Sequence, residues 1–199
     1  MGHWVLARLM LTPANPLYSW GGLNLTLFQW INGVRLPAVD AAAAVLTRVG
    51  SPDTFPVYLL AAWLLSAWRP RWLPRGNVAA FGVGFGLGAW AVGLLKVSLD
   101  FPRPLAVLGA LVHVIGAPEY RYSFPSGHSA FAFLLAASLS PGTRAPVRIV
   151  LWCFACGVAL SRVVVGAHFP ADIVGGALLG VLASYLGRSL LSFGRDRRP

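Results

Sequence analysis

Long apolar stretches separated by short polar segments make up most of this chain. The stretches that are long and apolar enough to be read as membrane spans cover about 54–68, 77–99, 126–140, 147–166 and 170–192. A helix needs about 20 apolar residues to cross the hydrocarbon core of a bilayer, so the shorter stretches lie at the low end of spanning length. The pattern predicts an all-α fold, a polytopic transmembrane helical bundle.

Two further helices are predicted ahead of these spans. The segment LNLTLFQWIN (23–32) is typical of an amphipathic helix at the membrane interface. The segment LPAVDAAAAVLTRVG (36–50) predicts a helix that begins at Pro37 and ends at Gly50. Its Asp40 and Arg48 leave open whether it completes a sixth span or is partly re-entrant. We therefore expect five to six spans in one membrane-embedded domain over residues 1–199, with an interfacial N-terminal segment over residues 1–35.

Composition agrees with this class and explains the net charge. The chain is 57% hydrophobic and 11% charged, with eight tryptophans and a formal net charge of +10. Its arginines concentrate in RPRWLPR (69–75), PGTRAPVR (141–148) and GRDRRP (194–199), which the five spans place on one side. The positive-inside rule makes that side cytoplasmic. Segments 50–53, 100–125 and 167–169 then fall on the opposite side, and the charge indicates orientation rather than nucleic-acid binding.

Two short motifs resemble those of soluble proteins but occur inside apolar spans. FGVGFGLG (81–88) lacks a preceding strand and the G-x-G-x-x-G spacing of a dinucleotide site. Its pairs Gly82/Gly86 and Gly84/Gly88, like Gly176/Gly180, have the spacing that lets helices approach closely. Cys153 and Cys156 lie in the middle of a span, so we expect them to be packing residues rather than a redox or metal pair.

Three polar clusters interrupt the apolar pattern at span ends. They are KVSLDFPRP, with Lys96 and Arg103, then PSGH (125–128), and finally SRVVVGAHFPAD (161–172). The predicted topology places all three on the non-cytoplasmic face. Charged groups are costly at membrane depth, so their convergence on one face predicts a functional site.

The first property of this site is anion binding. Lys96, Arg103 and Arg162 supply positive charges, and arginine matches phosphate oxygens two at a time. Ser126 and Gly127 precede a span, where the N–H groups at a helix N-terminus also favour an anion. Together these five residues predict a cup for a phosphate group.

The second property is nucleophilic chemistry. His168 lies four residues before Asp172, and Pro170 marks the start of a helix, so the Asp172 carboxylate can hold one ring nitrogen of His168. The other ring nitrogen is then a nucleophile. His128, at the start of another span, can protonate a leaving oxygen. The set predicts phosphoryl transfer through a phosphohistidine.

The same residues carry a resemblance to a known family. Lys96-x6-Arg103-Pro104, Pro125-Ser126-Gly127-His128 and Ser161-Arg162-x5-His168-x3-Asp172 resemble the three-part signature of the type 2 phosphatidic acid phosphatase superfamily, here over residues 96–172. The resemblance implies that His168 is the nucleophile, His128 the acid and Asp172 the partner of His168. It implies phosphate binding by the side chains and backbone of Lys96, Arg103, Ser126, Gly127 and Arg162. It also implies no metal and no cofactor.

Other interpretations are weaker. No third ligand at metal spacing accompanies His168 and Asp172, which argues against zinc. A transporter would distribute its charged residues along a pathway rather than at one face. The vanadium haloperoxidases of the same superfamily are soluble, unlike this chain. The other charged residues of the 100–125 segment, Asp100, His113, Glu119 and Arg121, are expected to solvate it rather than to take part in chemistry.

We therefore expect a multi-pass lipid phosphatase of the bacterial inner membrane, with its site facing the periplasm or the cell exterior. Its expected partners are the lipid bilayer and a membrane lipid phosphate, and it binds no nucleic acid. Undecaprenyl pyrophosphate is the first choice of substrate by resemblance. Phosphatidylglycerophosphate, phosphatidic acid and lipid A phosphates stay open, as does phosphotransfer to a lipid acceptor. The sequence does not fix the oligomeric state.

Overall fold

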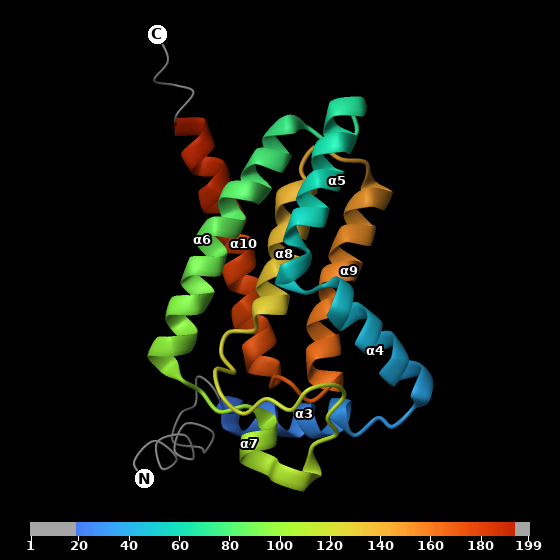
Figure 1. Cartoon of the computed structure of the whole chain (residues 1–199), viewed down its shortest axis with the longest axis vertical. Coiled ribbons are helices and arrows are strands. Elements are labelled where there is room, and N and C mark those ends of the chain that lie inside the picture. Colours follow the sequence, from blue (N-terminus) through green and yellow to red (C-terminus); the bar gives the residue numbers. More distant parts are fainter. Residues whose placement is uncertain (1–18, 194–199) are drawn as a thin grey trace.

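Four helices run side by side and form the centre of the molecule. A computed structural model describes residues 19–193, and that part of the chain contains helices and loops but no strand. The central helices are α6 (Arg75–Leu99), α8 (Gly127–Leu139), α9 (Ala145–Val164) and α10 (Pro170–Phe193), as Figure 1 shows. The all-helical fold predicted from the sequence is confirmed for the described residues.

The bundle is held by close contact between α8 and α10. A Cβ atom added at Gly176 would lie 2.3 Å from the Ser126 carbonyl oxygen, and one at Gly180 would lie 2.1 Å from that of Ala130. Only glycine allows the two backbones to approach this closely. On α6, Gly84 is similarly tight against Leu134, whereas Gly86 has no neighbour within 4 Å on its Cβ side. The expectation of a close approach at Gly86 is therefore wrong.

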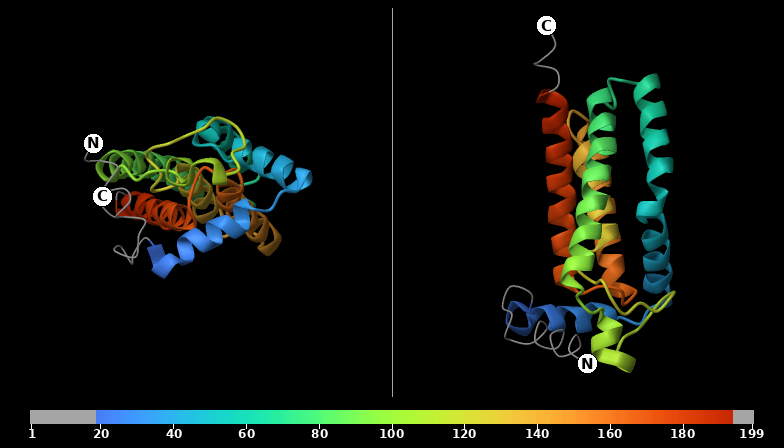
Figure 2. Two further views of the ribbon diagram at one scale, coloured as in Figure 1. Left: turned by 90° about the horizontal axis from the view of Figure 1, so that it is seen from below. Right: turned by 60° about the vertical axis from the view of Figure 1, so that its left-hand side comes forward.

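The helix predicted at 36–50 is present, and the following helix continues in the same direction along the bundle. α4 (Pro37–Val49) is followed by the short 3₁₀-helix η2 (Pro52–Thr54) and then by α5 (Phe55–Trp68). Figure 2 shows α4 and α5 end to end along the bundle. α5 has 14 residues and is only about 21 Å long, so α4 supplies the rest of the length. Segment 36–50 thus forms α4, which continues into α5 along the bundle instead of lying beside it as a separate helix.

The junction between α4 and α5 lies at a different place from the loop expected at residues 50–53. Residues 50–53 were predicted on the non-cytoplasmic face, but they lie part of the way along the bundle (Figure 2). The reason is packing, because a Cβ at Gly50 would lie 2.5 Å from the Val158 side chain of α9. Gly50 thus lets the chain bend against α9 at this junction.

α3 (Leu23–Asn32) lies across one end of the bundle (Figure 1). Asn24, Phe28 and Asn32 are its buried residues, one helical turn apart. The Phe28 ring packs on Phe169 at 5.1 Å, and the Asn32 side chain donates to the carbonyl groups of His113 and Val164, each at 2.9 Å. The helix is amphipathic as predicted, and its polar inner face ties the loops at this end together.

Apart from residues 50–53, the turns and connections divide between the two ends as the sequence predicts. Residues 69–74 and 140–144 lie at the end opposite α3, where α10 also finishes, while residues 100–126 lie beside α3 (Figure 1). The third basic segment, 194–199, lies outside the described residues. The two ends are called here the basic end, with the turns 69–74 and 140–144, and the α3 end.

The described residues contain three helical segments that are long and apolar enough to cross a membrane: Arg75–Leu111, Ala145–Val164 and Pro170–Ser192. The spans predicted at 54–68 and 126–140 correspond to the shorter helices α5 and α8, of 14 and 13 residues. The protein is a multi-pass membrane protein in which these shorter helices lie within the same bundle.

The two cysteines do not pack inside the bundle as expected. Cys153 and Cys156 are both exposed and unpaired on the outer surface of α9, whereas Ala155 between them is fully buried. The reason is the helical period, which turns Ala155 toward Ala132 and Ala136 of α8 and the cysteines outward.

Candidate active site

Lys96 and Arg103 are held by the backbone of the connection before α8. Lys96 lies in the last turn of α6, and its Nζ donates to the Tyr122 carbonyl oxygen at 2.9 Å. Arg103 precedes the short helix α7 (Pro104–Leu108), and its Nε donates to the Arg121 carbonyl oxygen at 2.8 Å. Neutral backbone carbonyl groups therefore help to fix both cations at the α3 end.

The start of α8 faces the same region. The Ser126 hydroxyl accepts from the Ser129 N–H at 3.4 Å and so caps the helix, while the Ser126 N–H donates to the Asp172 carbonyl oxygen at 3.0 Å. The first-turn N–H groups of Gly127 and His128 cannot bond within the helix. Ser126 thus positions the helix start, and any anion bound there would meet backbone N–H groups with the favourable end of the helix dipole.

Arg162, in the last turn of α9, is a nearly buried cation with few partners. Its side chain is 8% exposed. Its Nη1 lies 3.5 Å from the Thr47 hydroxyl of α4, and its Nε has no hydrogen-bond partner within the described part of the chain. Because a nearly buried guanidinium with an unused N–H donor is costly, this arrangement favours binding of an oxyanion.

His168 and Asp172 form a buried pair between α9 and α10. The His168 Nδ1 lies 3.3 Å from the Asp172 Oδ2, which also accepts from the Ser123 hydroxyl at 2.5 Å and from the Phe169 N–H at 2.9 Å. On the other side of the ring, Nε2 lies 3.3 Å from the Arg103 Nη1. A carboxylate on one side and a guanidinium donor on the other assign the proton to Nδ1 and a lone pair to Nε2.

The surroundings of His168 also keep its ring uncharged. Burial, followed by the positive charges of Arg103, Arg162 and Lys96, lowers the pKa of His168 well below its usual value. His128 stands within electrostatic range of His168 and of the same three cations. The structure thus combines a neutral imidazole with a lone pair and a strongly positive environment.

All the predicted site residues meet at this end of the bundle. They come from α6, the connection to α7, the start of α8, the end of α9, the turn that follows it and the start of α10. They are Lys96, Arg103, Ser126, Gly127, His128, Arg162, His168 and Asp172. Within residues 19–193, no three histidine, cysteine, aspartate or glutamate side chains gather as a metal site would require.

Two residues at the site were not predicted from the sequence. Ser123 holds Asp172, and Glu119 contacts both arginines, with its Oε2 2.5 Å from the Arg103 Nη1 and 3.7 Å from the Arg162 Nη2. The expectation that Glu119 solvates its loop is therefore wrong. One signal in the sequence is that Glu119 is the only glutamate of the chain.

The remaining charged residues of the connection lie outside this cluster. His113 pairs with Asp40 of α4 at 3.1 Å, and Arg121 pairs with Asp100. Both pairs are more exposed than the two arginines of the site, and they join the connection to the helix ends. The cluster itself can bind a tetrahedral oxyanion beside an oriented ring nitrogen.

Comparisons with known proteins agree with this chemistry. A family model described as the PAP2 superfamily matches residues 77–194. The chain is 27% identical to an undecaprenyl-diphosphatase of Sulfolobus acidocaldarius, over 96% of this chain and 92% of that protein. It is 33% identical to a decaprenylphosphoryl-5-phosphoribose phosphatase of Mycolicibacterium smegmatis, over 70% of this chain and 72% of that protein.

A solved structure extends the likeness to the fold. The crystal structure of Aquifex aeolicus LpxE superposes with a TM-score of 0.75 at 30% identity, covering 84% of this chain and 95% of that one. The family model covers all three polar clusters and more than half of the chain. This protein therefore belongs to the PAP2 superfamily and is one of its membrane lipid phosphatases.

Proposed function

We propose that the protein hydrolyses the terminal phosphate of a prenyl diphosphate lipid, undecaprenyl pyrophosphate, through a phosphohistidine on His168. The observation that carries this proposal is the geometry of that ring. Its Nδ1 is held by Asp172, and its Nε2 lies 3.3 Å from the Arg103 Nη1 inside a group of three cations. A nucleophile is thus oriented toward the place where a phosphate would bind.

In the first step, the His168 Nε2 attacks the terminal phosphorus and the bond from phosphorus to the bridging oxygen breaks. The lipid monophosphate leaves, and His128 gives its proton to the leaving oxygen. Lys96, Arg103 and Arg162 balance the charge on the phosphoryl oxygens, which is the main task in phosphoryl transfer. In the second step, water attacks the phosphohistidine, His128 takes the proton of the water, and inorganic phosphate forms.

An apolar cavity next to the cluster supports a lipid with a slender chain beside its phosphate. The cavity measures about 220 Å³ and lies between α6, α8 and η2, where Pro52, Phe85, Val92, Gly93 and Gly127 are among its lining residues. Because Gly127 belongs both to this cavity and to the start of α8, a phosphate bound there would have its first carbons in an apolar space.

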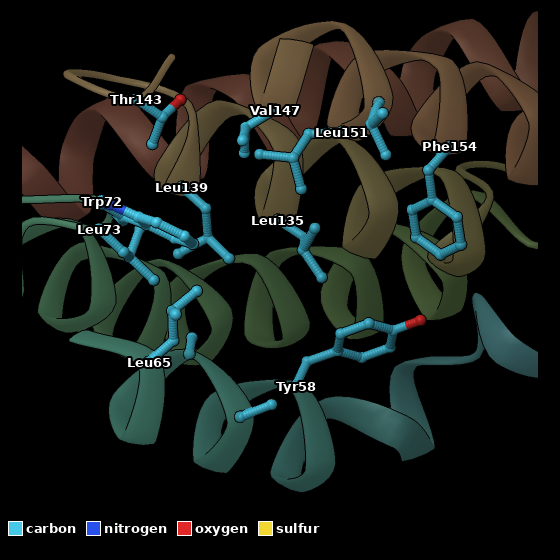
Figure 3. Close-up of a pocket in the computed structure, with 13 residues that line it drawn as sticks. Tyr58, Leu65, Trp72, Leu73, Leu135, Leu139, Thr143, Val147, Leu151 and Phe154 are labelled. Atoms are coloured by element: carbon cyan, nitrogen blue, oxygen red, sulfur yellow. The ribbon is translucent and has the colours of Figure 1, made fainter. Parts of the chain in front are cut away.

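A larger apolar cavity is less suited to hold the lipid chain beside the phosphate. It measures about 350 Å³ and lies between α5, α8 and α9 (Figure 3), lined by Tyr58, Leu135, Leu139, Leu151, Phe154 and other mainly apolar residues. None of the polar cluster residues lines it, and Trp72 and Thr143 place it toward the basic end. We assign the lipid chain next to the phosphate to the smaller cavity for this reason.

The choice of a prenyl lipid also draws on the relatives. Two of them carry prenyl names, undecaprenyl-diphosphatase and decaprenylphosphoryl-5-phosphoribose phosphatase. The connection between Pro104 and Pro125 is short, so no large domain is available there to recognise an elaborate head group. With the basic turns in the cytoplasm, the site faces the periplasm or cell exterior, and the chain acts as one membrane-embedded domain in the inner membrane.

The test is phosphate release by protein purified in detergent, compared as kcat/KM across undecaprenyl pyrophosphate, phosphatidylglycerophosphate, phosphatidic acid and lipid A. We expect the prenyl diphosphate to be turned over most efficiently. A higher kcat/KM for a glycerophospholipid or for lipid A would overturn the choice of substrate. Transfer of the phosphate to an added lipid, in place of release, would make the protein a phosphotransferase. No release from any of them, together with solute flux across vesicles, would favour an anion transporter.

A further inference from the structure

Glu119 occupies a position that the mechanism reserves for substrate. Its carboxylate lies between the two site arginines, with Oε2 2.5 Å from the Arg103 Nη1 and 3.7 Å from the Arg162 Nη2. The same Arg103 Nη1 lies 3.3 Å from the His168 Nε2. A phosphorus that reacts with Nε2 must approach it to about 3–3.5 Å, which brings the phosphate oxygens within reach of the N–H donor that Glu119 now occupies.

The charges of the cluster explain why a carboxylate lies there. The Arg103 and Arg162 side chains are each 8% exposed, and Lys96 adds a third cation within electrostatic range of both. Asp172 is engaged by His168, Ser123 and the Phe169 N–H. Glu119 is thus the acidic side chain that directly contacts the two arginines in the described part of the chain, and it reduces their mutual repulsion.

Glu119 differs from the residues it contacts in its access to water. Its side chain is 46% exposed, against 8% for each arginine. The backbone next to it is anchored independently, because the Arg103 N–H donates to the Tyr120 carbonyl oxygen at 2.9 Å and the Arg103 Nε to that of Arg121 at 2.8 Å. The carboxylate can therefore turn out to solvent while the cations stay in place.

We propose that Glu119 is a resident competitor for the phosphate cup. It leaves the arginines when a lipid phosphate binds, and it returns to them when the inorganic phosphate is to be released. A cup of three cations would otherwise retain inorganic phosphate, whereas a lipid substrate gains additional binding free energy from its apolar chain. Glu119 thereby favours lipid-linked over inorganic phosphate. This role rests on the proposed function only for the identity of the lipid, since the competition concerns any tetrahedral oxyanion.

The experiment measures binding of inorganic phosphate and of orthovanadate to the full-length protein in detergent by titration calorimetry, without lipid. In Glu119→Gln the side chain keeps its size but no longer competes as an anion. We expect both dissociation constants to fall at least about tenfold, and product inhibition by phosphate to strengthen in parallel. Glu119→Asp keeps the charge on a shorter side chain, and we expect its constants to lie between those of the wild type and Glu119→Gln.

Asp100→Asn is the matched control. It removes the same charge from the same connection, but Asp100 pairs with Arg121 outside the cup, so both constants should stay at the wild-type values. Unchanged or weaker binding in Glu119→Gln would overturn the proposal, as would equal tightening in Asp100→Asn. Tighter binding in Glu119→Gln, in a protein that releases no phosphate from any lipid tested, would support the competitor while rejecting the proposed substrate.

Discussion

The two ends of the bundle use the same residue type in opposite ways. At the α3 end, Arg103 and Arg162 are almost buried. Both contact Glu119, and Arg103 also lies beside His168. At the basic end, Arg69 and Arg144 are exposed and lie over the tryptophan rings of Trp68 and Trp72, at 4.6 Å and 5.5 Å from the ring centroids. The first pair shares one carboxylate, that of Glu119, and the second pair is solvated.

This difference shows that the net charge of +10 has two physical origins. Exposed arginines at the basic end keep their contact with water, and by the positive-inside rule we expect them to orient the chain in the membrane. Buried arginines at the α3 end cost free energy unless an anion joins them, which is why we propose that they bind the phosphate of the substrate. Arginine content alone cannot separate these roles, but burial and the number of partners can.

The contrast between the two ends of the bundle is tested most strongly by removing the proposed nucleophile, His168, from the α3 end. His168→Ala should lower the rate of phosphate release by about 10⁴-fold or more, because no other described side chain has a ring nitrogen oriented by Asp172. His113→Ala is the control at the same end, where His113 pairs with Asp40 away from the cluster. Turnover by His168→Ala within tenfold of the wild type, in protein that inserts normally, would contradict the phosphohistidine.

The next largest effect compares arginines of the two ends. Arg103→Lys should lower kcat/KM by about 10²-fold, because lysine cannot reach the Arg121 carbonyl oxygen, Glu119 and the position beside His168 at once. Arg144→Lys, at the basic end, should leave kcat/KM within about twofold, since its contact is with Trp72. Steady-state phosphate release from the same lipid measures kcat/KM for both variants. An equally small loss in both would show that the charge of Arg103 matters rather than the geometry of its guanidinium group.

Regular patterns in the sequence predicted the helices and the cluster of polar residues at the α3 end. The site residues that were not predicted, Glu119 and Ser123, lie in an irregular segment. His168 and Asp172 are one helical turn apart, and Ser126–His128 form the start of an apolar helix, so local geometry was enough to relate the residues within each group. Glu119 and Ser123 lie in a connection without helical period, and their contacts with Arg162 and Asp172 depend on tertiary packing.

The same reasoning explains the error at residues 50–53. Hydropathy shows where a chain is apolar, but it does not show that two short apolar helices lie end to end along the bundle. That arrangement depends on Gly50, which allows α4 to bend against Val158 of α9. Likewise, the apolar run around Cys153 does not reveal which side of α9 faces α8.

A smaller effect is expected from the residue that holds Asp172. Ser123→Ala removes the hydroxyl at 2.5 Å from the Asp172 Oδ2 and should lower kcat about tenfold, which corresponds to one hydrogen bond to a charged group. Ser138→Ala is the control, because Ser138 donates to Ser184 at 2.9 Å away from the cluster. We expect it to lower the free energy of unfolding by about 1 kcal/mol and to leave kcat unchanged. Equal effects of the two changes on kcat would mean that Ser123 has no positioning role.

The smallest predicted effect is on protonation of His168 in the ligand-free protein. Its pKa is lowered, first by burial and then by Arg103, Arg162 and Lys96, so the ring should stay neutral at a pH where an ordinary histidine, with a pKa near 6.5, is already protonated. The unfolded chain then binds the additional proton, and stability falls as the pH drops below about 6.5. Histidine-selective ¹⁵N NMR, with His168→Asn to identify the signal, should show a neutral ring with its proton on Nδ1 at pH 6. A titration midpoint at or above 6.5 would mean that the carboxylate of Asp172 outweighs burial and the three cations of the α3 end.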